Sequence, residues 1–469
     1  MYSLDRIREL PRARVLEIVS VTVLVALVAL GMLAITMLGV SSTSWIVILC
    51  VVAGLPLLAY AITRSALVWP LALYAALVPF DNILNFSQSS TLTRLLGALC
   101  GFSLLCVLLA GRTARTPPMP TVLWAAAICW MGASTMWSVD ASWPPETLVS
   151  ILQLFALYLI ISLYPARESD LRALITATLV GGIVAAVYGL DLYLSGSQTI
   201  GSRLWLGTAG SKIDPNHFAA ALQLPLMIAL SWAVQARKMS AKVALSACGL
   251  LLAAGMYLTA SRGALIAAAV GLIVLAWRGR AYVQLGAVAA FAGALSLAFP
   301  TVWYRFVDPT QAGGAGRTSI WQVGLVAARD YWLVGSGIGT FPLSYDRSFL
   351  SVYQPITEHW HRVSHNLLVG TLVEIGIVGL ALVLAAWLAN FRTLSAIPRG
   401  SRLHWIAVAL ESALVALLVE SMFLDILTLK YLWLVFILVA ITYQSFRADV
   451  EAQARLESDP PRVNTPVSR

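Results

Sequence analysis

The sequence predicts an all-α, polytopic integral membrane protein with about 12–14 transmembrane helices and one large outer loop that carries short amphipathic helices. Hydrophobic residues make up 59% of the 469 positions, charged residues make up 11%, and the mean hydropathy is +0.82. A soluble protein of this length needs more charge to cover its surface. Apolar runs of about 17 residues or more recur along the chain, and each can cross a bilayer as a helix.

The apolar runs define the candidate spans. They lie at 16–40, 44–61, 66–80, 94–111, 121–137, 146–164, 171–194, 217–235, 242–259, 263–277, 281–299, 366–391, 404–422 and 427–446. The third and the tenth are short, so merging or re-entry there reduces the count to about twelve. The first run is too long for a signal peptide and lacks a small-residue cleavage site.

The basic residues predict the orientation, because cytoplasmic loops are enriched in Lys and Arg. With the N-terminus inside, 21 of the 31 Lys and Arg residues fall in inner segments, and the alternation holds at every turn. Both termini are therefore predicted to be cytoplasmic, and residues 300–364 to lie outside. The net charge of +9 follows from this placement and does not indicate nucleic-acid binding.

Four regions follow from this reading. They are an N-terminal transmembrane bundle (1–299), an outer loop (300–365), C-terminal transmembrane helices (366–446) and a polar, disordered cytoplasmic tail (447–469). Within the loop, a glycine-rich turn precedes Arg317, and apolar residues then follow at helical spacing. This pattern predicts an amphipathic helix with Thr318 or Ser319 as its N-cap.

Several function classes lack their motifs. The five cysteines all lie in apolar runs and are expected to be buried hydrophobes, with no disulfide framework and no metal cluster. The chain contains neither a Walker A sequence nor a His-Glu-x-x-His zinc motif. The segment Gly335-Ser-Gly-Ile-Gly339 does not match a dinucleotide fingerprint, because no strand precedes it and its spacing differs.

His365 lies where the polar loop meets a long apolar helix. An isolated interfacial histidine more often caps or hydrogen-bonds a helix end than performs catalysis. Glu374 follows nine residues later and is expected to face the protein interior, as a structural partner rather than a catalytic group.

Basic residues also lie where short outer loops should lack them. They are Arg203, Lys212, Arg262 and Arg317. A guanidinium at the outer face suits a phosphate or diphosphate group. Alternatively, these residues pair with lipid phosphates or with Asp308, Asp330, Asp346 and Glu358.

The segment Asp214-Pro215-Asn216-His217 precedes the helix at 217. Asp214 or Asn216 is a good N-cap, and Pro215 fixes the approach of the chain. A capped helix N-terminus can also bind an anion, so the segment has two possible roles.

These features together resemble the bacterial O-antigen ligases and the related O-antigen polymerases and protein-glycan ligases. The resemblance covers about residues 200–390 of the chain. It rests on His365-Asn366 followed by Gly376 and Gly379, on Asp214-Pro215-Asn216, on Ser261-Arg262-Gly263, and on Arg317 with Trp321.

The resemblance implies transfer of a glycan from undecaprenyl diphosphate at the periplasmic face of the bacterial inner (plasma) membrane. The acceptor is the lipid A-core in a ligase, another carrier-linked glycan in a polymerase, or a Ser/Thr side chain in a protein ligase. His365 is then the general base, and Arg262 and Arg317 hold the diphosphate, with Arg203 and Lys212 as weaker candidates. Asp214, Asn216, His217, Trp321 and Asn366 support the site.

By the same resemblance the enzyme needs no cofactor, metal or nucleotide, and its partners are the glycan donor, the acceptor and membrane lipids. A transporter or flippase for an anionic lipid is the competing class. Charges at the bilayer midplane favour transport, and the residues that decide this are Glu374, Glu420 and Asp191.

Overall fold

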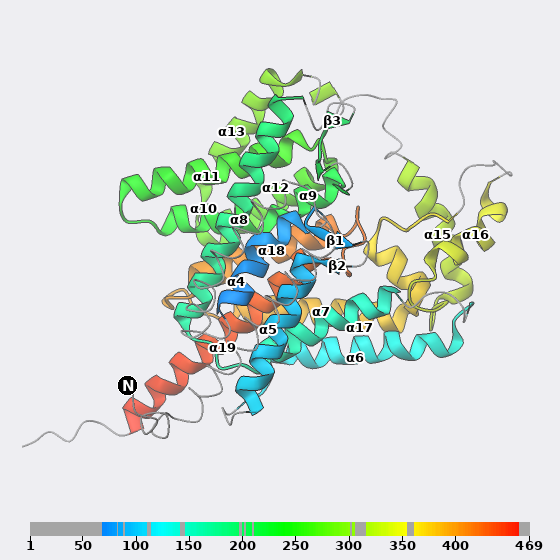
Figure 1. Ribbon diagram of the computed structural model, residues 1–469, viewed down its shortest axis with the longest axis horizontal. Helices are drawn as coiled ribbons and strands as arrows, with labels where there is room; N and C mark the ends of the chain where they lie inside the picture. The colour runs from blue at the N-terminus through cyan, green and yellow to red at the C-terminus, as the bar shows by residue number, and fades with distance from the viewer. Residues whose placement is uncertain are drawn as a thin grey trace, which may run out of the picture.

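The computed structural model describes residues 68–458, apart from short internal segments at 82, 88–89, 110–113, 141–145, 197–198, 201–202, 209–210, 301–302, 305–315 and 354–360. The first two predicted spans and the end of the tail lie outside the described residues. Figure 1 shows the described chain as a bundle of helices, with a smaller helical part at one end.

The all-α polytopic class is confirmed, because eight helices among the described residues are long and apolar enough to cross a membrane. The bundle comprises α4 (Val68–Leu77), α5 (Leu92–Leu109), α6 (Met119–Ser134), α7 (Glu146–Leu163), α8 (Glu168–Leu194), α9 (Pro215–Ala221), α10 (Gln223–Gln235), α11 (Met239–Leu258), α12 (Arg262–Gly279), α13 (Tyr282–Ala298), α17 (Leu367–Ser395), α18 (His404–Glu420) and α19 (Lys430–Ser458). Every predicted span from 66 onwards overlaps with one of these helices or, at 217–235, with α9 and α10.

Small and aromatic side chains set the helix packing. A Cβ added at Gly271 of α12 would lie 2.9 Å from the Cβ of Ala416, so glycine lets α12 approach α18 closely. The rings of Trp124 and Trp433 are 5.2 Å apart and fully buried, and they join α6 to α19. Exposed apolar residues such as Val184 belong on the lipid-facing surface of a membrane bundle.

Two helices are interrupted where the sequence predicted continuity. Leu222 forms a turn between α9 and α10. In α17, Gly376 has φ +68° and ψ −174°, which breaks the helix in a conformation that is essentially restricted to glycine. The predicted span at 366–391 therefore consists of two helical pieces that meet at Gly376.

The segment Gly335–Gly339 packs against this break, backbone to backbone. The backbone N–H of Ser336 donates to the Val373 carbonyl at 2.9 Å, and that of Gly337 donates to the Glu374 carbonyl at 2.8 Å. Gly335 and Gly337 both have positive φ, which glycine adopts at little cost. The glycine motif thus satisfies carbonyl groups that the interrupted helix leaves without intrahelical partners.

The predicted outer loop contains two helices, α15 (Arg317–Tyr331) and α16 (Phe341–Val352). They share a small core with the start of α17, formed by Ile320, Val323, Ala327, Ala328, Phe341, Tyr345, Phe349 and Val373. The predicted amphipathic helix is confirmed as α15, but its N-cap prediction is wrong. Gly316, with φ +80°, occupies the N-cap position without a side-chain hydrogen bond.

The helix α16 begins beside Glu374. The backbone N–H of Phe341 donates to Oε1 of Glu374 at 3.1 Å, so the carboxylate accepts a free N–H at the start of this helix. Glu374 is therefore a structural partner, as predicted from the sequence.

The described part of the chain also contains three two-stranded hairpins. They pair β1 (Asn85–Ser87) with β2 (Ser90–Thr91), β3 (Thr199–Ile200) with β4 (Arg203–Leu204), and β5 (Leu206–Thr208) with β6 (Ser211–Ile213), all antiparallel. The last two join α8 to α9 and carry Arg203 and Lys212 of the predicted site.

Candidate functional site

Asp214 forms the N-cap of α9. Its Oδ1 accepts hydrogen bonds from the backbone N–H and the side-chain Nδ2 of Asn216, both at 2.7 Å. Pro215 occupies the first turn, where its missing N–H costs nothing. The predicted cap is confirmed for Asp214, and it holds the Asn216 side chain in a fixed position.

Arg203 reaches from β4 to two other elements. Its Nε donates to the Thr259 carbonyl at 2.9 Å, and Nη2 donates to Oδ1 of Asn216 at 3.0 Å. Arg203 thereby ties the hairpin to α9 and to the turn between α11 and α12. These bonds make Arg203 a positioning residue for the neighbouring turn.

Arg262 begins α12 directly after that turn. Ala260 has a left-handed backbone with φ +50°, and the Ser261 hydroxyl accepts a long hydrogen bond from the Ala264 N–H at 3.4 Å. Gly263 lies against the ring of Phe423, where an added Cβ would approach Cγ to 2.9 Å. The sequence Ser-Arg-Gly therefore fixes the half-buried Arg262 at the end of its helix.

His365 lies between two anchored neighbours. The Trp321 indole Nε1 donates to the Ser364 carbonyl at 3.1 Å. Asn366 caps α17, because its Oδ1 accepts from the N–H groups of Leu368 and Val369 at 2.9 and 3.1 Å. Asn366 therefore caps α17, so the His365 imidazole is not needed as the cap of this helix.

His365 has φ +46°, in the left-handed region, where a residue with a Cβ pays about 1–2 kcal/mol. The anchors on either side hold the residue in this costly conformation. Strained backbone of this kind clusters at functional sites.

Several titratable groups around His365 and Arg317 influence one another electrostatically. Burial lowers the pKa of His365 below its usual 6.5, and the positive charge of Arg317 lowers it further, while Asp214 acts in the opposite direction. Burial also lowers the pKa of Arg317, with the charges of Asp214 and Glu420 opposing this and that of Arg262 adding to it. These electrostatic effects connect His365 and Arg317 with Arg262 and Asp214, which all belong to the predicted set of site residues. The His365 imidazole is neutral at pH 7.

Glu420 belongs to the same place. It ends α18, it is fully buried, and its charge acts on Arg317. Gln223 lies beside it and donates from Nε2 to the Ala264 carbonyl at 2.9 Å. Among the described residues, neither carboxylate oxygen of Glu420 has a hydrogen-bond partner of normal geometry. The sequence signal was a carboxylate within an apolar run, which had been considered for transport rather than for this site.

His217 and Lys212 complete the predicted set of site residues. His217 lies in the first turns of α9, and its buried Nδ1 has no hydrogen-bond partner among the described residues. The backbone of Lys212 pairs with Gly207 in the β5–β6 hairpin, and its side chain lies outside the described part of the structure. Among the described residues, no group of three His, Cys, Asp or Glu side chains could hold a metal ion.

The three acidic residues that would indicate transport lie away from the middle of their spans. Glu420 ends α18, Glu374 contacts α16, and Asp191 is exposed three residues before the end of α8. Fold and site together define a polytopic helical membrane protein with a histidine and arginines gathered at one end of its bundle.

Residues 247–384 match the family model described as O-antigen ligase. The matched residues include Arg262, Arg317 and His365, and the match supports the O-antigen ligase family, whose members are membrane glycosyltransferases of the ligase and polymerase type. The hairpin with Arg203 and the α9 cap precede the matched residues.

One solved structure is similar over 70% of this chain and 97% of its own, with 19% sequence identity and a TM-score of 0.40. It comes from work titled "Structural coordination of polymerization and crosslinking by a peptidoglycan synthase complex". A likeness at this TM-score supports no inference about this chain. The comparison with curated proteins gave no match.

Proposed function

We propose that this protein transfers an O-antigen-type glycan from undecaprenyl diphosphate to an acceptor hydroxyl at the periplasmic face of the inner membrane. The proposed acceptor is the lipid A-core, which makes the enzyme an O-antigen ligase. A polymerase that joins carrier-linked glycans is the alternative, since it needs the same donor chemistry. The reaction requires neither nucleotide nor metal, because cleavage of the sugar–diphosphate bond supplies the driving force.

In the proposed reaction, His365 accepts the proton of the acceptor hydroxyl as that oxygen attacks the anomeric carbon of the donor sugar. The bond between this carbon and the diphosphate oxygen breaks, and the diphosphate lipid leaves with the bonding electrons. A positioned base contributes about 10²–10⁴-fold to such a step. Arg262 and Arg317 stabilise the negative charge that develops on the leaving diphosphate.

The observation that carries the proposal is the placement of His365, between the anchored residues Ser364 and Asn366, where the charge of Arg317 acts on it. A neutral imidazole next to a guanidinium combines a base with an anion-binding group. Asn366 and Trp321 hold the backbone around it, which leaves the imidazole free of a capping role. The O-antigen ligase match spans both residues.

Arg203 has a different proposed role from Arg262 and Arg317. Arg203 is already bonded to Thr259 and Asn216, so its proposed role is to position the turn that bears Arg262.

Glu420 is an addition to the predicted set of site residues. Its carboxylate beside Arg317 is proposed to orient that guanidinium towards the donor.

The test is reconstitution of the purified protein in liposomes with a defined undecaprenyl diphosphate glycan. His365→Asn removes the base and keeps a residue that tolerates the left-handed backbone. His361→Asn is the matched control, since His361 also has positive φ but is a largely exposed side chain paired with Asp346. Transfer should fall about 10²-fold or more in His365→Asn and stay near wild type in His361→Asn.

Separate acceptors distinguish the proposals. Transfer to lipid A-core identifies a ligase, transfer to a second carrier-linked glycan identifies a polymerase, and transfer to a peptide hydroxyl identifies a protein ligase. Movement of the glycan across the bilayer without transfer to any acceptor would instead establish a transporter. Normal transfer by folded His365→Asn would exclude the catalytic role of His365.

A further inference from the structure

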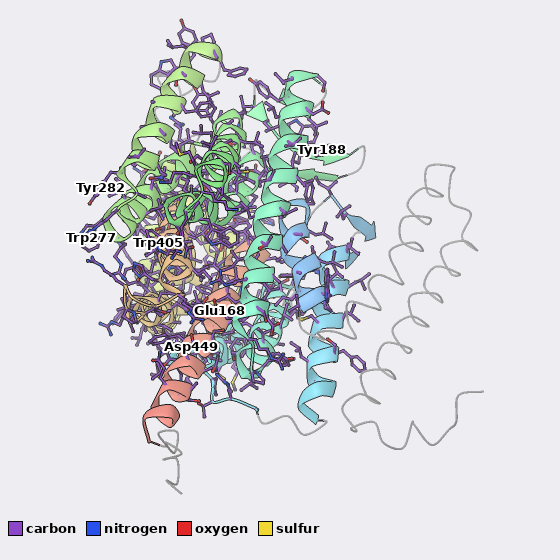
Figure 2. The ribbon with its side chains drawn as sticks, turned by 90° about the vertical axis from the view of Figure 1, so that its left-hand side faces the viewer. Glu168, Tyr188, Trp277, Tyr282, Trp405 and Asp449 are labelled. Carbon is purple, nitrogen blue, oxygen red and sulfur yellow. The ribbon has the colours of Figure 1, made fainter. Side chains whose placement is uncertain are left out.

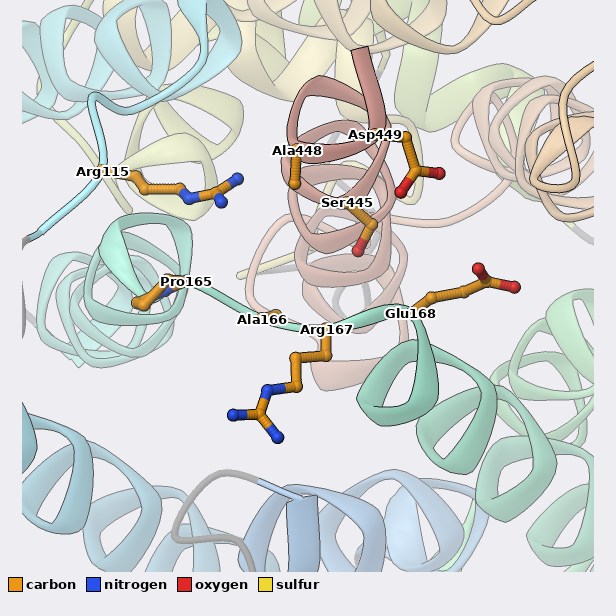
Figure 3. A pocket seen from close by; sticks show the side chains of 8 residues that line it. All are labelled: Arg115, Pro165, Ala166, Arg167, Glu168, Ser445, Ala448 and Asp449. Carbon is orange, nitrogen blue, oxygen red and sulfur yellow. The ribbon is translucent and has the colours of Figure 1, made fainter. Parts of the chain in front are cut away.

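A second polar site lies at the other end of the bundle. A pocket of about 440 Å³ is lined by Arg115, Pro165, Ala166, Arg167, Glu168, Ser445, Ala448 and Asp449 (Figure 3). Its volume falls within the range of about 300–1,000 Å³ that small-molecule sites occupy. The α7–α8 connection forms one wall, and α19 forms another.

The pocket lies far from His365, at the opposite end of α8 from the hairpin that carries Arg203. Glu168 begins α8, which is 27 residues long, and the hairpin with Arg203 follows the other end of that helix. At about 1.5 Å per residue, α8 separates them by roughly 40 Å, enough to cross a bilayer. Figure 1 agrees, because the C-terminal end of α19 and the α15–α16 pair lie on opposite sides of the molecule.

Opposite charges occupy opposite halves of the pocket. Figure 3 shows Arg115 and Arg167 towards the left of the view and Glu168 and Asp449 towards the right. Nη1 of Arg115 donates to the Gln444 carbonyl at 2.8 Å, which anchors this guanidinium at the pocket wall. A group with an anion at one end and a cation at the other matches this arrangement.

Ser445 marks the middle of the pocket. Its side chain lines the cavity, and Figure 3 shows its hydroxyl directed towards the space between the two charged halves. The residue is 3% exposed, and its buried Oγ has no hydrogen-bond partner among the described residues. Since a buried polar atom without a hydrogen-bond partner costs free energy, we expect the Ser445 hydroxyl to bind a polar ligand.

The residues around the pocket indicate that it lies at the depth of the lipid headgroups. The pocket opens where two apolar spans, Glu146–Leu163 and Glu168–Leu194, meet their polar connection. Figure 2 shows Glu168 and Asp449 near each other, and Trp277 and Tyr282 lie farther up along the face that is turned to the viewer. These two aromatic residues are 69% and 61% exposed, and exposed Trp and Tyr gather at the headgroup level.

We propose that this pocket binds the zwitterionic headgroup of a phosphatidylethanolamine lipid. Arg115, Arg167 and the Ser445 hydroxyl take the phosphodiester, and Glu168 and Asp449 take the ammonium. Glu168 is shared with Arg172, whose Nη2 is 2.6 Å from its carboxylate, so Asp449 carries the larger part of the ammonium recognition. The basic-residue pattern places this end at the cytoplasmic face, and the site is independent of the proposed transfer reaction.

The test is native mass spectrometry of the delipidated full-length protein with phosphatidylethanolamine, phosphatidylglycerol or phosphatidylcholine of identical chains. Phosphatidylethanolamine should bind most tightly, because phosphatidylglycerol lacks the ammonium and phosphatidylcholine has no N–H to donate. Arg167→Gln and Asp449→Asn should each weaken phosphatidylethanolamine binding about tenfold, the value of one hydrogen bond to a charged group. Ser445→Ala should weaken it less.

Asp449→Asn should also abolish the preference over phosphatidylglycerol, since the phosphate contacts remain. Arg447→Gln is the matched control, because Arg447 lies on the same stretch of α19 but binds Thr116 and Glu451 outside the pocket. Equal binding of all three lipids by wild type, or unchanged binding in both charge variants, would overturn the proposal. Glycerophosphoethanolamine that competes as well as the intact lipid would overturn the lipid assignment in favour of a soluble ligand.

Discussion

The indole Nε1 of Trp321 donates a 3.1 Å hydrogen bond to the carbonyl oxygen of Ser364, the residue before His365. The Trp321 ring also lies 6.4 Å, centroid to centroid, from that of Phe423, and Phe423 packs on Gly263 beside Arg262. One indole therefore links the helix of Arg317, the turn of His365 and the start of α12. The separate chemical groups of the site are held by shared packing.

The variant Trp321→Phe tests this link. It keeps an aromatic ring against Phe423 and loses the hydrogen bond to Ser364, which is worth about 0.5–1.5 kcal/mol, so kcat should fall roughly 3- to 10-fold. KM for the donor should change little, because the arginines remain. Steady-state transfer kinetics in liposomes measure both values. Trp332→Phe is the control, since the Trp332 side chain is 58% exposed just after the same helix. An equal loss in both variants would contradict the link.

The pH dependence of transfer should report the charges around His365. Since only the neutral imidazole accepts a proton, activity is lost as the pH falls through its pKa, which lies below the usual 6.5. Arg317→Gln removes a positive charge, so the pKa rises and the acid limb of kcat/KM moves to higher pH. Asp214→Asn removes a negative charge while keeping an N-cap, so the limb moves to lower pH.

Rate profiles between about pH 5 and 8 check these opposite shifts on the same preparation. The direction of each shift can be measured even where a variant is slower overall, because the acid limb of each variant is compared with the plateau rate of the same variant. Shifts of the same sign in the two variants would show that another group controls the acid limb.

The interruption of α17 should be sensitive to any side chain at Gly376. Its φ and ψ are accessible essentially to glycine alone, at a cost of about 1–3 kcal/mol for another residue. An added Cβ would also collide with the Leu333 carbonyl. Gly376→Ala should therefore lower the thermal unfolding temperature in detergent. Gly286→Ala, within α13 with no atom near its added Cβ, should have no destabilising effect. Equal stability of the two variants would mean that the break is not required.

Gly376 also shows what the sequence could and could not predict. The apolar periodicity gave the helix types and their order, because hydrophobic length alone decides which segments cross a bilayer. The break inside α17 is invisible to that measure, since Gly376 lies within one long and mainly apolar run. The partner of the break, the Gly335–Gly339 segment, is more than 35 residues away in sequence and could not be paired with it from local patterns.

The candidate site, like the fold, could be predicted from the sequence only in part. Arg262, Arg317 and His365 were predicted because each departs from a local rule, namely charge where outer turns should lack it and a titratable group at a helix start. Glu420 was named only as a candidate midplane charge, and its place beside Arg317 depends on how α18 packs against α12 and how α15 packs against α17. The separation of roles between Arg203 and Arg262 likewise required the hydrogen bonds of Arg203, which no sequence pattern encodes.

A buried ion pair should stabilise the end of the bundle that lies away from His365. Arg278 of α12 binds both carboxylate oxygens of the fully buried Glu411 at 2.8 and 3.0 Å, and the Ser395 hydroxyl donates to the same carboxylate at 2.5 Å. Glu411→Gln leaves the Arg278 charge without its partner and should lower the free energy of unfolding by about 3–5 kcal/mol. Transfer per folded molecule should stay unchanged, because the pair is remote from the site.

The surface pair of Arg447 and Glu451 provides the comparison, since its side chains are 39% and 52% exposed and 3.6 Å apart. Glu451→Gln should change the free energy of unfolding by less than about 1 kcal/mol. The double variant Arg278→Met, Glu411→Leu should recover most of the stability that Glu411→Gln loses, because it removes both charges and leaves apolar side chains of similar size. Denaturant unfolding in detergent measures all three variants. If the double variant is no more stable than Glu411→Gln, the loss arises from packing and not from the unpaired charge.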